Sequence, residues 1–249
     1  MFPTACTTLA AIAFLYSLAF PENIPAQPAS NIVALTFDDG PSALYTPQVL
    51  NILKKNGVHA TFFVIGENVE KYPALVKREV DEGNCVGNHT WSHPLNAPFE
   101  TKKQLTEQIL RTDSAVFRAA GVHTTLLRPP HGWESPWMVK NAEALGYDVV
   151  NWTVDANDWK HPSANVIIKR VERANGKSAI VLLHDGLGLK ANPKQGNTPR
   201  ALQEIIDDFK LRGYAFVTIE QLIRDPNAEK RYRGLFKVIK EPAKIHHKL

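Results

Sequence analysis

Short apolar runs alternate with amphipathic stretches along the chain from residue 31 onward. The runs are rich in β-branched and aromatic residues, and two of them, IVALTF and AIVLL, are apolar at almost every position. A strand that helices cover on both faces has this composition, so the pattern predicts a parallel sheet. The predicted strands are Ile32–Phe37, His59–Ile65, Asn84–Asn88, Thr124–Arg128, Asp148–Val154, Ser178–Leu183 and Tyr214–Thr218.

The amphipathic stretches predict helices that connect these strands. The first begins at Thr46-Pro47, a cap followed by a first-turn proline, and ends at Gly57. Strands that alternate with helices favour a single distorted (β/α) barrel of about seven parallel strands, with an open doubly wound sheet as the alternative. The other predicted helices are Pro73–Glu82, Lys102–Ala120, Pro136–Leu145, Ala164–Ala174 and Pro199–Arg212.

The first 30 residues differ in character from the rest of the chain. Residues 1–21 carry no Asp, Glu, Lys or Arg, and Leu9–Phe20 is an apolar run of signal-peptide length. Residues 1–20 are therefore predicted to be a signal peptide, with Ser17-Leu18-Ala19 as a candidate small-x-small cleavage site, and 21–30 a Pro-rich linker. No basic residue precedes the run, so an uncleaved anchor and a mis-assigned start codon are the alternatives. A secreted or cell-envelope protein without a stable membrane span is expected.

Composition and charge narrow the class of protein. With 44% hydrophobic and 22% charged residues in a chain of 249, the composition is globular, and one domain is predicted over residues 31–224. The net charge of +4 arises at the end of the chain, because residues 230–249 hold seven Lys/Arg and one Glu. Nucleic-acid binding is therefore not indicated, and residues 225–249 are predicted to be a basic tail that an anionic cell-wall surface would attract.

Polar residues gather where the predicted strands end. The carboxyl ends of the strands of an α/β barrel open on one face, and that face carries the chemistry of such folds. Each polar segment alone has an ordinary explanation as a turn, an exit loop or a buried polar residue, but their convergence on one rim indicates a functional site. The segments are Asp38–Pro41 (DDGP), His89–His93 (HTWSH), Arg128–Gly132 (RPPHG), Asp155–Trp159 (DANDW) and His184–Gly186 (HDG).

His89 and His93 are four residues apart, a spacing that places both imidazoles on the same side of one helical turn. With an aspartate from a neighbouring strand end, they form a set of two histidines and one carboxylate. That set suits Zn²⁺ or another borderline divalent ion and leaves coordination positions open for water and substrate. The sequence therefore predicts one divalent metal ion, with Zn²⁺ favoured and Co²⁺ or another divalent ion as the alternative.

Together these segments resemble the polysaccharide deacetylase family, the NodB homology domain of carbohydrate esterase family 4. TFDDGP (Thr36–Pro41), HTWSH, RPPHG, DANDW and LLH (Leu182–His184) stand in the order of the family's five motifs, and the resemblance covers about residues 30–223. It implies a distorted (β/α) barrel, which the strand count favours independently. One departure is His131, where many relatives carry Tyr or Phe, and its effect on substrate packing stays open.

The resemblance implies a metal site and a base. Asp39, His89 and His93 would bind the metal, which lowers the pKa of its water and polarises the acetamide carbonyl. Asp38 would accept a proton as the water attacks, and Arg128 would orient Asp38 and keep it ionised.

The same resemblance implies which groups stabilise the oxyanion and protonate the leaving amine. The backbone N–H of His131 would stabilise the oxyanion, with Pro129 and Pro130 holding that amide in place. His184 would protonate the leaving amine, and Asp158 would raise its pKa. The walls of a small apolar pocket for the acetyl methyl group would be Trp159 and Leu182.

The predicted function is the metal-dependent removal of N-acetyl groups from N-acetylglucosamine units of a polysaccharide or oligosaccharide, of chitin or peptidoglycan type. The protein would be a hydrolase of carbon–nitrogen bonds other than peptide bonds, with an acetylated glycan as its partner. The alternatives are an O-acetyl esterase acting on xylan and a glycan-binding protein without turnover. A serine hydrolase is not favoured, because the chain has no G-x-S-x-G elbow.

Overall fold

The computed structural model describes residues 31–94, 101–190 and 196–240. The predicted signal peptide and the linker lie outside these residues. Within the described ranges, no helix is both long and apolar enough to cross a membrane.

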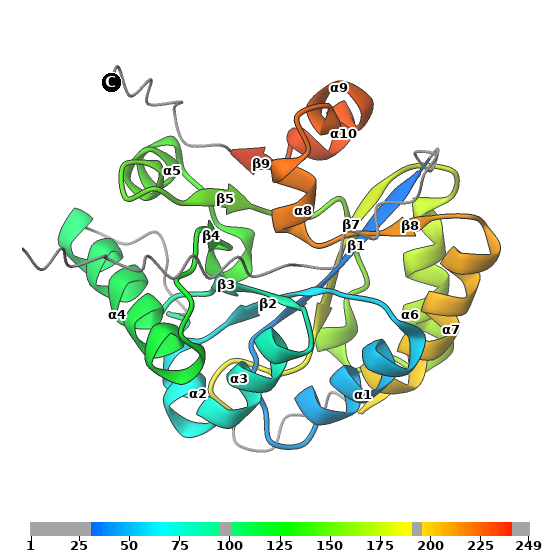
Figure 1. Cartoon of the computed structure of the whole chain (residues 1–249), viewed down its shortest axis with the longest axis horizontal. Helices are drawn as coiled ribbons and strands as arrows, with labels where there is room; N and C mark the ends of the chain where they lie inside the picture. Colours follow the sequence, from blue (N-terminus) through cyan, green and yellow to red (C-terminus); the bar gives the residue numbers. More distant parts are fainter. Residues whose placement is uncertain (1–30, 95–100, 191–195, 241–249) are drawn as a thin grey trace, which may run out of the picture.

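A curled sheet forms the centre of the molecule, and helices surround it (Figure 1). Its nine strands follow the order β6-β7-β1-β2-β3-β4-β5-β9, with β8 paired to β1, and every pair is parallel except β5 with β9. This architecture confirms the predicted distorted (β/α) barrel. The strands are β1 (Ile32–Asp38), β2 (Thr61–Val64), β3 (Cys85–Asn88), β4 (Leu126–Leu127), β5 (Asp148–Val150), β6 (Val154–Asp155), β7 (Ala179–His184), β8 (Ala215–Phe216) and β9 (Ile239–Lys240).

The predicted strand over residues 148–154 is two strands that pair with different partners. β5 pairs with β4, whereas β6 pairs with β7 on the far side of β1. Between them, the Asn151 N–H donates to the Val238 oxygen at 2.9 Å, and the Thr153 N–H donates to the Ile180 oxygen at 3.0 Å. This crossing segment therefore links the two margins of the curled sheet, and an apolar run alone does not reveal such a change of partner.

The helices pack on the outer face of the sheet, where the larger apolar cluster lies. Strand residues that point outward, such as Val33, Leu35 and Phe37, meet the apolar faces of α1, α6 and α7 there. The longer helices match the predicted ones closely, while α2 and α8–α10 are additional. Their bounds are α1 (Thr46–Asn56), α2 (Gly66–Lys71), α3 (Pro73–Asp81), α4 (Lys102–Ala120), α5 (Pro136–Glu143), α6 (Ala164–Val171), α7 (Asn197–Leu211), α8 (Ile219–Arg224), α9 (Ala228–Arg231) and α10 (Arg233–Phe236).

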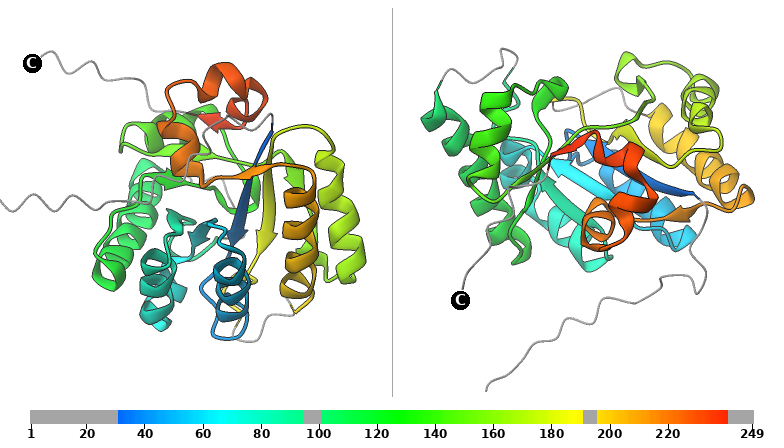
Figure 2. Two further views of the ribbon diagram at one scale, coloured as in Figure 1. Left: turned by 45° about the vertical axis from the view of Figure 1, so that its right-hand side comes forward. Right: turned by 90° about the horizontal axis from the view of Figure 1, so that it is seen from above.

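A second apolar cluster fills the interior of the barrel. Ile32 and Ala34 of β1 belong to it, as do Leu235 and Ile239 from the range that the sequence analysis assigned to a basic tail. α8–α10 lie at the end of the barrel from which β1 starts (Figure 2). Residues 225–240 thus form part of the fold, because their few apolar side chains cover the barrel interior, whereas their many charges had indicated a basic tail outside it.

Candidate metal centre and cleft

Strand alternation brings the polar residues to one mouth of the barrel. In β1 the even-numbered side chains face the interior, so Asp38 follows Ile32 and Ala34 on that face. The parallel register pairs Asp38 with His184 of β7. The last residues of these two neighbouring strands therefore lie side by side at the carboxyl end of the sheet.

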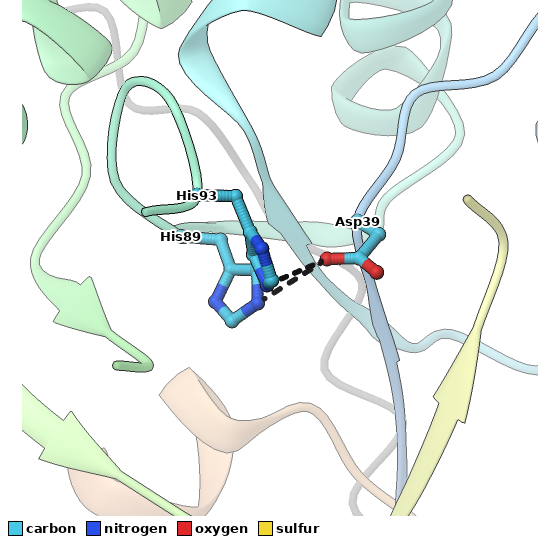
Figure 3. A group of neighbouring side chains, drawn as sticks. All are labelled: Asp39, His89 and His93. Carbon is cyan, nitrogen blue, oxygen red and sulfur yellow. Dashed lines mark ion pairs between the residues drawn. The ribbon is translucent and has the colours of Figure 1, made fainter. Parts of the chain in front are cut away.

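Asp39, His89 and His93 form a compact group of potential metal ligands (Figure 3). The Asp39 Oδ1 atom lies 3.5 Å from His89 Nε2 and 3.2 Å from His93 Nε2. All three ligand atoms lie within 4.8 Å of one another, and it is the one such group of three or more that the described residues contain. The two histidines and the carboxylate predicted from the sequence are thus close enough to share one ion.

The backbone of Asp39 is held in an unusual conformation. Its φ of 71° lies in the left-handed region, which is rare for a residue other than glycine and is typical of functional sites. Asn68 donates to the Asp39 carbonyl at 2.9 Å, and the Gly188 N–H donates to Oδ2 at 2.8 Å. The buried Oδ1 has no hydrogen-bond partner among the described residues, so it is free to ligate a cation.

The turn from His89 to His93 is not helical, which corrects the predicted geometry. Thr90 and His93 both have positive φ, 68° and 47°. Asn88 Oδ1 accepts from the Thr90 N–H at 2.9 Å, and Gln108 Oε1 accepts from the next two N–H groups at 2.8 and 3.0 Å. The spacing correctly brings the imidazoles together, but side chains of β3 and α4 shape the turn.

A neutral His93 and an ionised Asp39 suit a divalent ion, whereas the nearby carboxylates of Asp38 and Asp39 raise the pKa of His89 despite its burial. His89 Nδ1 lies 2.7 Å from the Arg128 carbonyl, which fixes Nδ1 as the donor and turns the Nε2 lone pair towards Asp39. Burial lowers the pKa of His93 to about 4, so its ring is neutral near pH 7. Burial opposes ionisation of Asp39, yet the pKa of this carboxyl is held below its usual range by the neighbouring His89, His93 and His184. A carboxylate with two such rings is a donor set for Zn²⁺ or a similar ion.

Asp38 is fixed by a guanidinium inside the barrel. The fully buried Arg128 donates from Nη1 to Asp38 Oδ1 and to Thr36 Oγ1, both at 2.7 Å. Its Nε and Nη2 donate to the carbonyls of Val150 and Asn151, each at 3.1 Å. These contacts leave the other carboxylate oxygen of Asp38 facing the metal-ligand group.

His184 and Asp158 form a second fixed pair. His184 Nδ1 lies 2.7 Å from Asp158 Oδ1, and the His184 N–H donates to Asp158 Oδ2 at 2.8 Å. Thr198 also donates to Oδ2, at 2.7 Å. Burial lowers the pKa of His184, but the charge and hydrogen bond of Asp158 outweigh it and raise the pKa to about 10. The ring is therefore an imidazolium near neutral pH, with Nε2 available as a donor.

The segment after β4 forms a tight turn, η1 (Pro130–Gly132). Its hydrogen bonds come from the Gly132 N–H to the Pro129 oxygen at 3.0 Å and from the Trp133 N–H to the Pro130 oxygen at 3.1 Å. His131 has φ 60° and lies outside this bonding. Its N–H is thus not used to close the turn.

A cleft of about 920 Å³ opens over these groups, within the range of small-molecule sites. Eight of the predicted residues line it, whereas Arg128, Asp158, Pro129 and Pro130 are buried behind it and support those that do. Both predicted pocket walls border the cleft, Leu182 as a buried side chain and Trp159 as an exposed one. The eight are Asp38, Asp39, His89, His93, His131, Trp159, Leu182 and His184.

Asp185 is a structural member of the site that the sequence analysis left without a role. Its carboxylate accepts a hydrogen bond from Thr46, and its N–H donates to the Asp38 carbonyl at 3.2 Å. It packs so closely on Gly40 that a Cβ there would lie 2.4 Å from Oδ2. Burial raises the pKa of Asp185 to about 7. No spacing in the sequence points to this contact, because it joins segments that are far apart in the chain.

Comparison with known proteins agrees with this architecture. A family model described as polysaccharide deacetylase matches residues 26–150. The peptidoglycan-N-acetylglucosamine deacetylase PgdA of Listeria monocytogenes is 40% identical over 206 residues, 83% of this chain and 41% of PgdA. The peptidoglycan-N-acetylmuramic acid deacetylase PdaC of Bacillus subtilis is 38% identical over 205 residues, 82% of this chain and 41% of PdaC. The chain thus spans about two fifths of the length of these relatives.

Two solved structures are similar over most of the described fold. The Bc1960 peptidoglycan N-acetylglucosamine deacetylase has a TM-score of 0.71 and 37% identity, covering 77% of this chain and 86% of that chain. BA3943 from Bacillus anthracis, a pseudoenzyme of carbohydrate esterase family 4, has a TM-score of 0.71 and 32% identity, covering 78% and 66%. The chain belongs to the polysaccharide deacetylase family, as its five motifs predicted.

Proposed function

We propose that this protein is a metal-dependent hydrolase that removes N-acetyl groups from N-acetylglucosamine or N-acetylmuramic acid units of a glycan. The observation that carries the proposal is the juxtaposition, in one cleft, of a two-histidine, one-carboxylate group with a free carboxylate oxygen and an imidazolium. Hydrolysis of an amide needs an activated water, a stabilised oxyanion and a proton for the leaving amine, and this cleft offers groups suited to each.

Asp39, His89 and His93 would hold one divalent ion, with Zn²⁺ favoured by the nitrogen-rich donor set. The unpartnered Oδ1 of Asp39 and the fixed tautomer of His89 support this fit. Bound there, the ion would lower the pKa of a water molecule and polarise the acetamide carbonyl.

Asp38 would accept the proton from the attacking water through the oxygen that Arg128 leaves free. The His131 N–H, which the η1 turn does not use, would donate to the oxyanion that forms as the water oxygen bonds to the carbonyl carbon. Because the prolines before it are buried, this donor is fixed before the substrate arrives.

His184 would donate its Nε2 proton to the glycosamine nitrogen as the carbon–nitrogen bond breaks. The products would be acetate and a free amine on the sugar. An amine leaves poorly without protonation, and Asp158 keeps the imidazole charged over the neutral range. Trp159 and Leu182 would enclose the methyl group of the acetyl substituent.

The names of the relatives favour peptidoglycan as the glycan and the cell envelope as the place of action, since PgdA and PdaC are both peptidoglycan deacetylases. Chitin-type oligosaccharides carry the same N-acetylglucosamine unit and serve as defined substrates. The basic residues near the C-terminus would add attraction to an anionic wall polymer.

The test is acetate release by the purified full chain from acetylated chito-oligosaccharides and from peptidoglycan, with products identified by mass spectrometry. Release is expected with Zn²⁺ or Co²⁺ and should stop after chelation, then return when the metal is restored. Chelator-resistant release would overturn the metal assignment, and no release from any N-acetylated glycan would overturn the proposed activity.

A glycan-binding protein without turnover is the second candidate, favoured by the similarity to the pseudoenzyme BA3943. Glycan binding without acetate release at any metal supplied would support it. An O-acetyl esterase is distinguished by His184→Ala, because an alkoxide leaves more easily than an amine. That variant should lose amide hydrolysis far more than ester hydrolysis if the amide is the native bond.

A further inference from the structure

A row of aromatic rings leads from the metal-ligand group to the surface. The ring centroids of His89 and His93 lie 5.0 Å apart, those of His93 and His131 4.8 Å apart, and those of His131 and Trp133 4.6 Å apart. Trp133 is the outermost ring and is 43% exposed. The indole therefore contacts His131, which lines the cleft, and keeps much of its surface open to solvent.

The backbone that carries Trp133 is firmly held. Its N–H donates to the Pro130 oxygen at 3.1 Å, and Gly132 before it has φ 68°. A Cβ on Gly132 would lie 2.5 Å from the Trp152 ring, so the turn packs directly against that side chain. An aromatic ring on such a turn loses little conformational freedom when a ligand covers it.

An indole held at the edge of a cleft suits a partner with an apolar face and a polar rim. A pyranose ring has this character, since its axial C–H groups form an apolar face and its hydroxyls point outward. A second protein is a poorer fit, because a stable protein interface buries about 800 Å² on each partner, and Trp133 lies between the exposed His131 and Glu134. A glycan bound in the cleft supplies such a ring, because its next sugar is covalently joined to the reacting sugar.

We propose that Trp133 is a sugar-binding platform that stacks on the residue next to the reacting one in an N-acetylated glycan. This inference rests on the proposed function, because it takes the cleft to hold one acetylated hexosamine. Stacking on Trp133 would make the protein selective for oligomers over single sugars. Part of that selectivity would then come from a side chain outside the catalytic and metal-binding groups.

The experiment compares the full metal-loaded chain with its Trp133→Ala and Trp133→Phe variants. KM and kcat are measured on tetra-N-acetylchitotetraose, and dissociation constants are measured by calorimetry for this tetramer and for N-acetylglucosamine. Trp133→Ala is expected to raise KM and the Kd of the tetramer by about tenfold, with kcat and the Kd of the single sugar within about twofold. Phenylalanine should restore most of the tetramer affinity.

The matched control is Phe117→Ala on α4, which removes another exposed ring, one that stacks on His123, a residue that does not line the cleft. It should leave all these values unchanged. An unchanged tetramer Kd in Trp133→Ala, or an equal loss for tetramer and single sugar, would overturn the platform. If the wild-type chain releases no acetate but binds the tetramer, the proposed activity fails, while the Kd comparison still decides the role of Trp133.

Discussion

Asp38 and Asp39 are neighbours in the chain but have different surroundings. The Asp38 side chain faces the barrel interior, where Arg128 grips one oxygen at 2.7 Å. Asp39, with its φ of 71°, turns its carboxylate towards His89 and His93. In the proposed mechanism, this one backbone conformation would divide two identical carboxylates between proton transfer, at Asp38, and metal binding, at Asp39.

Replacing Asp38 by Asn should remove the base without removing the ion. Turnover is expected to fall by about 10²- to 10⁴-fold, because an amide cannot accept the proton, while metal content stays near one ion per chain. His89→Ala should instead lose the ion, measured by mass spectrometry of the bound metal. His123→Ala, a surface histidine paired with Asp113, is the control for non-specific metal loss. Normal turnover in Asp38→Asn would contradict the assignment of the base.

The His184–Asp158 pair predicts the alkaline limit of activity. The pKa of His184 is raised from 6.5 to about 10, so proton donation persists through neutral pH and fails as the pH rises through that value. Asp158→Asn removes the main raising cause, and the alkaline limb of the kcat profile should move to lower pH. Asp81→Asn, which alters an exposed ion pair with Lys77, should leave the profile in place.

The same pair should also stabilise the folded state, and the raised pKa of His184 fixes the pH range in which it does so. A histidine whose folded-state pKa lies above its unfolded value stabilises the fold fully below about pH 6.5, and this contribution is lost as the pH rises through about 10. Asp158→Asn should therefore narrow the difference in unfolding temperature between pH 6 and pH 10. An unchanged difference would show that the pair does not couple to folding.

At the scale of elements, the ends of β1 and β7 interlock. Gly186 lies so close to the Asp39 carbonyl that a Cβ there would be 2.1 Å from the oxygen, and Asp185 packs against Gly40 in the same way. The turn that presents Asp39 is therefore shaped by a segment far away in the sequence. Small residues at these positions allow two backbones to approach closely.

Gly186→Ala should push these strand ends apart. The expected effect is a loss of about 1–3 kcal/mol in unfolding free energy, together with weaker metal binding, because the displaced backbone carries Asp39. Gly234→Ala is the matched control, since a Cβ there would meet nothing within 4 Å. Chemical denaturation and metal titration of both variants test this. Equal stability of the two would contradict the interlock.

Elements and motif residues could be read from the sequence because their signals are local. Apolar runs and glycine stops located the strands and long helices, and the strand ends located Asp38, His89 and His184. The split of β5 from β6, the turn that Gln108 shapes and the packing of Asp185 on Gly40 depend on contacts between residues that are 16 or more positions apart in the chain. No local pattern encodes such contacts. The spacing of His89 and His93 gave the correct proximity through the wrong geometry.

At the scale of the whole molecule, the two ends of the barrel differ: one end carries the candidate site, and helices cover the other. The cleft opens at the carboxyl ends of the strands, while α8–α10 and β9 lie at the other end, where the Ile219 N–H donates to Thr61 Oγ1 at 3.0 Å. The apolar interior that supports Arg128 therefore depends on the C-terminal segment as well as on the strands.

Leu235→Ala tests this dependence. Leu235 is 2% exposed in the interior cluster, so its truncation is expected to lower the free energy of unfolding by about 2–4 kcal/mol. Leu211→Ala, at a leucine that is 87% exposed, should change it by no more than about 0.5 kcal/mol. Thermal and urea unfolding compare the two. An unchanged free energy of unfolding in Leu235→Ala would contradict the inference that the C-terminal segment covers the barrel interior.

The central place of β1 in the sheet has a consequence for synthesis on the ribosome. β2 follows β1 within about 30 residues, but β7, which covers its other edge, emerges only from residue 179 onward. A growing chain would thus already contain β1, β2 and β3 long before that edge is paired. We expect the unpaired edge of β1 to be the place where stalled chains associate with one another.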